Sequence, residues 1–244
     1  MYASVVCFFI TALFECFIRL GYQVREFPGN VLSMVKNDFS SSIRFIMKEQ
    51  PTIMKMLLLA AFSRFFVMGI TLVGLPFLVR AVLGLDAKFY GGAESAMAVA
   101  TILGSIAAGL LTGKLRSGRL SYVLAAIGVC IIPAGVVFLF PFGVMTRYAV
   151  IVAAFCGMQA AISIFSIFAV SMIQQNTPNE LIGKIMAYTS AVTLCAQPVG
   201  QMVYGFLFDR FQGSVYLVLI PSGIVVCIIG LLAAGFLKKL KSFQ

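Results

Sequence analysis

One arginine stands out as a residue that could do chemistry, because it lies inside a long apolar run. Arg64 is the only charged residue between Lys55 and Arg80. It lies roughly 15 Å beyond the start of the run at about 1.5 Å per residue, near the middle of a membrane-length helix. A charge at that depth is costly and is by default a functional candidate. The alternative is a structural ion pair or a side chain that reaches the headgroups.

Polar positions in other apolar runs form a second group of candidates. Gln159, Ser163 and Ser166 are spaced by four and three residues, so they share one face of a helix. That face is a candidate for binding, or it could hydrogen-bond a neighbouring helix. Glu94, at the outer mouth of another run, is a candidate proton-coupling carboxylate, with an interfacial position as the alternative.

No pattern typical of an enzyme or a metal site occurs. The sequence has no histidine, which excludes His-dependent triads and His metal sites. It also lacks the phosphate-binding pattern G-x-x-x-x-G-K-[ST], so ATP is not expected as a direct energy source. The six cysteines lie in apolar runs without a C-x-x-C pair, which is typical of small buried hydrophobic residues. We predict neither an enzyme nor a bound cofactor or metal.

The composition indicates what positions these side chains. Of the 244 residues, 61% are hydrophobic and only 11% are charged, whereas a soluble domain has roughly 25% charged residues. The chain therefore needs a bilayer as solvent, and roughly 17–25 apolar residues cross the hydrocarbon core as one helix. We predict an all-α integral membrane protein with seven transmembrane helices, near residues 2–18, 55–80, 94–113, 120–141, 147–173, 184–208 and 213–237.

The basic residues are distributed unevenly between the gaps. One alternate set of gaps holds thirteen lysines and arginines and the other holds four. Because cytoplasmic loops carry the excess of Lys and Arg, the richer side is predicted to be cytoplasmic. The C-terminus then lies in the cytoplasm and the N-terminus outside, in a multi-pass protein of the cell membrane. The net charge of +10 follows this pattern and not one basic face, so no nucleic-acid partner is expected.

One gap is much longer than the others and suggests a domain boundary. Apolar residues at helical spacing after Asp38 predict an amphipathic helix over 38–49 on the membrane surface, ended by Pro51. We predict an orphan transmembrane helix, a cytoplasmic linker, a six-helix bundle and a basic cytoplasmic tail, at residues 1–20, 21–54, 55–237 and 238–244.

Small residues at spacings of four predict close helix contacts in the third run. They form two ladders, Ala100-Gly104-Ala108 and Ser105-Gly109-Gly113. Such faces let membrane helices approach closely.

Two loops resemble a signature of the major facilitator superfamily, which reads roughly G-x-L-x-D-R-x-G-R. The loop after the sixth run matches its first part with Gly205, Leu207, Asp209 and Arg210. The loop after the third run matches its end with Arg116, Gly118 and Arg119, but Leu115 stands where the family has Asp. A long linker followed by six spans is also similar to the C-terminal half of such a transporter.

This resemblance implies a fold and roles for the candidate residues. The first span would be helix six of the family, and the next six would be helices seven to twelve, built as inverted three-helix repeats. Arg64 and the polar face of the fifth span would then line the substrate cavity, and the two loop motifs would act in gating. In that cavity Arg64 could meet an anionic or carbonyl group of the substrate, or a carboxylate of an N-terminal half. The departure at Leu115 puts the gating contact of that loop in question.

The resemblance also implies a function. The general pattern of the sequence is similar to that of macrolide-efflux and siderophore-export members of the superfamily. This similarity implies a secondary transporter that exports a hydrophobic or drug-like small molecule, driven by a proton gradient. The expected partners are the bilayer, the substrate, a proton or ion, and an N-terminal half or second chain that supplies the other wall. Two alternatives stay open: a seven-helix receptor-type membrane protein, and a non-transporting truncated fragment or assembly subunit.

Overall fold

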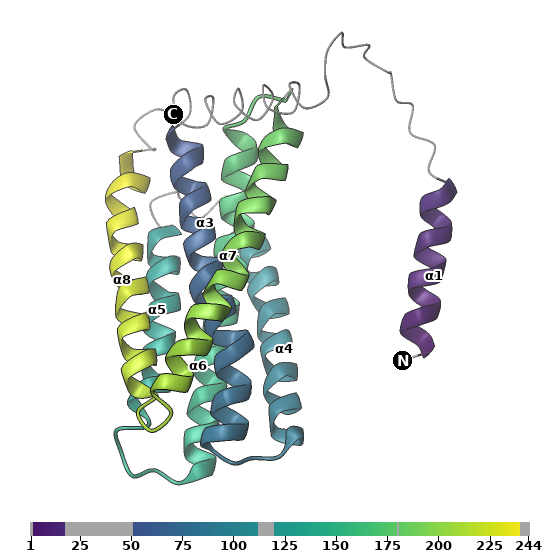
Figure 1. Ribbon diagram of the computed structural model, residues 1–244. Helices are drawn as coiled ribbons and strands as arrows, with labels where there is room; N and C mark the ends of the chain where they lie inside the picture. Colours follow the sequence, from purple (N-terminus) through teal and green to yellow (C-terminus); the bar gives the residue numbers. More distant parts are fainter. Residues whose placement is uncertain (1, 18–50, 112–119, 180, 240–244) are drawn as a thin grey trace. The chain divides into compact units, whose positions relative to one another are not determined.

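The computed structural model describes residues 2–17, 51–111, 120–179 and 181–239, and its described residues contain helices and no strand (Figure 1). The chain divides into two units, residues 1–41 and 42–244. Helix α1 (Tyr2–Phe17) belongs to the first unit, and all later helices belong to the second. The predicted amphipathic helix over 38–49 lies outside the described residues.

Each predicted apolar run that the structure describes is helical. In the second unit, the helical segments are α3 (Pro51–Gly69), η2 (Ile70–Gly74), η3 (Phe77–Val82), α4 (Ala87–Leu111), α5 (Leu120–Val136), α6 (Val144–Gln175), α7 (Ile182–Arg210) and α8 (Tyr216–Lys239). Pro51 begins α3, where proline is tolerated because it lacks only an amide that the first turn leaves unpaired.

Five helical stretches are long and apolar enough to cross a membrane. They are Ile53–Val82, Ala87–Leu111, Val144–Gln175, Ile182–Arg210 and Tyr216–Gly235. Two further apolar helices are shorter, at Val5–Phe17 and Leu120–Val136. An all-helical membrane protein is therefore confirmed, while two of the seven predicted spans remain predictions.

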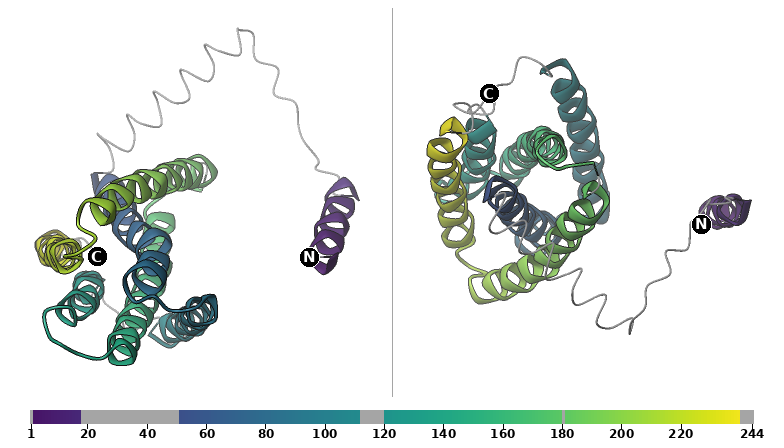
Figure 2. Two further views of the ribbon diagram at one scale, coloured as in Figure 1. Left: turned by 60° about the horizontal axis from the view of Figure 1, so that its bottom comes forward. Right: turned by 90° about the horizontal axis from the view of Figure 1, so that it is seen from above.

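The helices of the second unit pack in pairs around a common core. α5 packs along α8, α3 along α7, and α4 along α6, and α6 also contacts α5 and α3. Figure 2, in the view from above on the right, shows α3 and α6 toward the centre of this bundle, with the other helices around them. The core between them consists of large apolar side chains such as Met158, Phe165 and Phe208.

Glycines bring paired helices into backbone contact. A Cβ atom added at Gly104 of α4 would lie 2.6 Å from the carbonyl oxygen of Ala160 on α6. Gly200 of α7 lies against the carbonyl group of Phe65 on α3 in the same way. A Cβ atom at Gly109 would meet nothing within 4 Å. The ladder through Gly104 is thus confirmed as a contact face, and the ladder through Gly109 is open at that residue.

The C-terminal part of the second predicted span departs from α-helical geometry. The two segments η2 and η3 are π-helical and are separated by two residues. Buried side chains in this part recur every four residues, at Thr71, Leu75, Val79 and Leu83. The sequence predicted one regular helix over 55–80, so the change of helix type was not foreseen.

Candidate functional site

The intramembrane arginine lines a pocket formed by three helices. The pocket has a volume of about 190 Å³ and lies between α3, α6 and α7. α3 contributes Ala60 and Arg64, and α6 contributes Ser166 with three apolar residues. The side chains from α7 are Met186, Thr189, Ser190 and Thr193. The structure therefore brings together two of the sequence candidates, Arg64 and Ser166, with polar residues of a third helix.

Arg64 has no acidic partner in the part of the chain that the structure describes. No ion pair or hydrogen bond of its guanidinium to a described residue is present. The sequence explains this, because residues 148–179 and 185–208, which form most of α6 and α7, contain no charged residue. A half-buried charge that has no counter-ion is costly, so the described part of these helices leaves the charge of Arg64 uncompensated.

The hydroxyl groups in the pocket differ in whether they already donate a hydrogen bond to the protein. Thr189 donates to the carbonyl of Ile185 at 2.8 Å, and Thr193 donates to that of Thr189 at 2.7 Å. Ser166 and Ser190 are exposed, and their hydroxyls hydrogen-bond no described residue. These two serines, one on α6 and one on α7, are the pocket hydroxyls that can donate to a ligand.

The predicted polar face of α6 divides between two environments. Ser163 lies 2.8 Å from the hydroxyl of Ser105 and 3.2 Å from the carbonyl of Thr101, both on α4. It therefore joins α6 to α4 and does not line the pocket. Gln159 does not line it either, and its buried Oε1 atom has no partner among the described residues. At about 100° per residue, Ser163 and Ser166 point about 60° apart, enough to face different neighbours.

The remaining candidates lie away from the pocket. Glu94 is exposed near the start of α4 and accepts a 2.8 Å hydrogen bond from the hydroxyl of Tyr90, one turn earlier. Gly205, Asp209 and Arg210 lie in the last two turns of α7, where the two charged residues are exposed. The other loop motif, Arg116, Gly118 and Arg119, lies outside the described residues.

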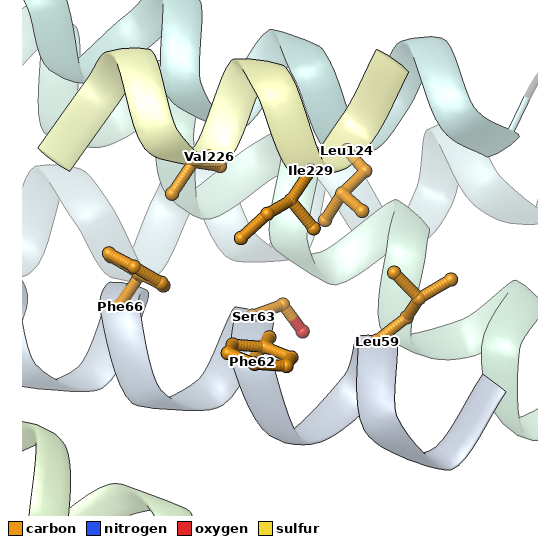
Figure 3. A pocket seen from close by; sticks show the side chains of 7 residues that line it. All are labelled: Leu59, Phe62, Ser63, Phe66, Leu124, Val226 and Ile229. Atoms are coloured by element: carbon orange, nitrogen blue, oxygen red, sulfur yellow. The ribbon is translucent and has the colours of Figure 1, made fainter. Parts of the chain in front are cut away.

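Two other pockets offer fewer polar groups that could bind a ligand. Figure 3 shows a pocket of about 10 Å³ between α3, α5 and α8, whose one polar side chain, Ser63, already donates to the carbonyl of Ala60. An open groove of about 430 Å³ between α3 and α7 is lined almost wholly by apolar side chains, among them Phe62, Phe65 and Phe66. Neither combines a charge with a cavity, as the Arg64 pocket does.

The sequence did not single out the pocket residues of α7. Thr189 and Thr193 are spaced by four and share a face with Met186 and Ser190. That spacing is a usable signal, but such hydroxyls commonly bond to their own helix, as both threonines do here. Only the packing of α7 on α3 tells which face of α7 meets Arg64.

Comparison with known proteins agrees with this architecture. The sequence model of the Major Facilitator Superfamily matches residues 1–196. No curated protein and no solved structure matches the chain. Members of this family are transporters rather than enzymes, which fits the absence of an enzyme pattern in the sequence. The chain therefore belongs to the major facilitator superfamily and is a multi-pass membrane transporter that works on a small-molecule substrate.

Proposed function

We propose that α3 to α8 are the C-terminal six-helix half of a secondary transporter, and that the Arg64 pocket is part of its substrate path. The observation that carries the proposal is an arginine near the middle of a membrane-spanning helix that lines a cavity of three helices. Substrate sites of secondary transporters lie near the bilayer midplane, where helices of different repeats meet. Arg64 lies thirteen residues from the start of α3 and eighteen from the end of η3, close to that depth.

The packing pattern supports the inverted-repeat part of the proposal. If α3, α4 and α5 correspond to α6, α7 and α8, then the pair α3–α7 corresponds to the pair α6–α4. Both pairs are among the main contacts of the bundle, and the pair α5–α8, which corresponds to itself, is another. The contact between α5 and α6 departs from this relation, because its counterpart between α8 and α3 is small. A pseudo-two-fold axis between two triplets produces this relation. With α5 as a spanning helix, the N-terminal α1 would be helix six of the family.

The direction of transport and its driving force also belong to the proposal. We infer export of a hydrophobic or drug-like molecule in exchange for protons, as in macrolide-efflux and siderophore-export members. Apolar residues such as Val170, Ile173 and Met186 beside Arg64 support an amphiphilic substrate. Glu94, whose carboxylate is within reach of the Tyr90 hydroxyl, is our candidate for proton coupling. The family match disfavours the alternative of a seven-helix receptor.

The site includes residues near the ends of α6 and α7 that the distribution of basic residues in the sequence predicts to be cytoplasmic. Ile173 and Met186 are within one turn of the adjoining ends of α6 and α7. Lys184 lies in the first turn of α7, and Lys55 lies near the start of α3, at the same end of the bundle (Figure 1). By the charge rule this is the cytoplasmic side, which supports uptake of substrate from the cytoplasm and a cytoplasmic C-terminus in the cell membrane.

The test is a flux measurement on the full chain in proteoliposomes, where a second copy of the chain can supply the other wall of the pathway. We expect an imposed pH gradient to drive proton movement, reported by an entrapped pH-sensitive dye, when amphiphilic probes of negative, neutral or positive charge are added. At least one probe should give a flux above that of protein-free vesicles. Arg64→Ala should abolish this flux without changing expression, while Arg80→Ala, at an exposed arginine outside the pocket, should keep it.

The same measurement can refute the proposal. Flux in Arg64→Ala equal to that of the unmodified chain would exclude the pocket from the substrate path. Absence of flux with every probe would favour the remaining alternative, a non-transporting fragment or assembly subunit that needs a second chain.

A further inference from the structure

We propose that the Arg64 pocket selects small amphiphilic monoanions and binds their carboxylate group. This inference rests on the proposed function, because it names the class of substrate that the site takes. It follows from three properties of the pocket: one unpaired cation, two free hydroxyls and an apolar wall.

The charge of the pocket favours an anion. Arg64 is the only charged residue among the described residues that line it, and no described carboxylate pairs with it. An ionised group in this position is stabilised most by an opposite charge that arrives with the ligand. A single guanidinium balances one negative charge, so a monoanion fits better than a dianion. A cationic substrate would leave two positive charges without a counter-ion.

The hydrogen-bond donors of the pocket match a carboxylate. A guanidinium presents two parallel N–H groups to the two oxygens of a carboxylate, in a geometry that a lysine does not reproduce. A carboxylate has further lone pairs, and the hydroxyls of Ser166 and Ser190 are available to donate to them. The pocket threonines already donate to carbonyls of their own helix. The donor set therefore comes from three helices and suits one anionic head.

The rest of the described lining of the pocket is apolar and suits a small hydrophobic body. Ala169, Val170, Ile173 and Met186 supply this surface. The volume of about 190 Å³ is slightly larger than the ~150 Å³ of an apolar cavity that binds benzene. A body of about the size of one aromatic ring or a short branched chain fits this space. The flexible thioether of Met186 can adapt to variation in that body.

The experiment compares three probes that share one ring and differ in charge. Benzoate, benzamide and benzylamine are titrated against the full chain in nanodiscs by saturation-transfer difference NMR, with empty nanodiscs to subtract partition into lipid. We expect benzoate to bind saturably, with a dissociation constant at least tenfold lower than that of either other probe. Loss of a hydrogen-bonded charge pair changes binding by about that factor or more.

Matched variants locate the binding. Arg64→Gln should remove the preference for benzoate, and Arg64→Lys should keep only part of it, because charge is retained without the two-pronged geometry. Arg80→Gln, on the same span but exposed and outside the pocket, should behave as the unmodified chain. If Arg64→Gln does not fold, as judged by circular dichroism, the double variant Ser166→Ala/Ser190→Ala decides, and it should weaken benzoate binding several-fold.

Either of two comparisons overturns the inference: equal binding of benzoate and benzamide, or an undiminished preference for benzoate in Arg64→Gln. The absence of saturable benzoate binding up to about 10 mM, the range of very weak ligands, also overturns it. These outcomes are distinct from failure of the proposed function. An Arg64-dependent flux of a neutral or cationic probe, together with no preference for benzoate, would leave the transport pathway in place and remove only the monoanion class.

Discussion

Replacement of Gly104 by alanine tests whether the contact between α4 and α6 holds the bundle together. The added Cβ atom would lie 2.6 Å from the carbonyl oxygen and 2.8 Å from the Cα of Ala160. Both are backbone atoms, so no side chain can rotate away. An ordinary contact begins near 3.4 Å, and α4 and α6 must therefore separate by about 0.8 Å at this point.

The separation also breaks a hydrogen bond nearby. The hydroxyls of Ser105 and Ser163 are 2.8 Å apart one residue further along α4, and a shift of that size carries them beyond hydrogen-bonding distance. Overpacking costs about 1–3 kcal/mol, and an interhelical hydrogen bond in a membrane contributes about 0.6–1.7 kcal/mol. Because alanine is a better helix former than glycine, the substitution also adds at most about 1 kcal/mol to the stability of the helix. We expect a net loss of about 1–3 kcal/mol in the free energy of unfolding.

Gly109→Ala is the matched control on the same helix. It gains the same helix propensity, but its Cβ atom meets nothing within 4 Å. We expect it to leave stability unchanged or to raise it by up to about 1 kcal/mol. The assay is unfolding in mixed micelles by titration with sodium dodecyl sulfate, followed by far-ultraviolet circular dichroism. The two variants should differ by about 1–4 kcal/mol.

Two outcomes would refute this reasoning. Equal unfolding midpoints for Gly104→Ala and Gly109→Ala would mean that α4 and α6 do not make the contact described. A double-mutant cycle gives the second test, because Ser163→Ala should cost little once Gly104→Ala has already separated the serines. Full additivity of the two changes would show that the hydrogen bond survives the separation.

Two further predictions test polar groups. Tyr204→Phe should lower the free energy of unfolding by about 0.6–1.7 kcal/mol, because the buried hydroxyl donates to Ser222 at 2.7 Å. The control is Tyr122→Phe, at an exposed tyrosine, which should leave the free energy of unfolding unchanged in the same titration. Ser163→Ala and Ser166→Ala should have opposite profiles: the first lowers stability by a similar amount and spares flux, and the second spares stability and lowers flux. Reversed profiles would show that the pocket, and not the α4 contact, contains Ser163.

The positions of the helices could be predicted from the sequence, but their ends could not. A run of apolar residues marks the part of a helix that needs hydrocarbon around it, and a helix can continue beyond that part into the polar interface. α4 begins at Ala87, seven residues before the predicted start, and its first turns contain Lys88, Glu94 and two glycines. α5 ends at Val136 rather than near 141, and a turn follows it.

The candidate site was predictable in part. Arg64 was identifiable because a charge within a long apolar run has few structural explanations. Ser166 and Ser163 were not separable, since their spacing places them on one broad face and only the neighbours divide it. Ser190 gave no signal of its own, because small polar residues in membrane helices serve packing as often as binding.

The π-helical segments change how the sequence of this span should be interpreted. In an α-helix each residue turns by about 100°, so positions four apart drift by about 40° and Leu83 would point about 120° away from Thr71. Both are nevertheless buried, as are Leu75 and Val79 between them. A wider helical turn keeps all four on one side. Cysteine labelling along this span should therefore show two accessibility rhythms, one of about 3.6 residues up to Gly69 and a longer one beyond it.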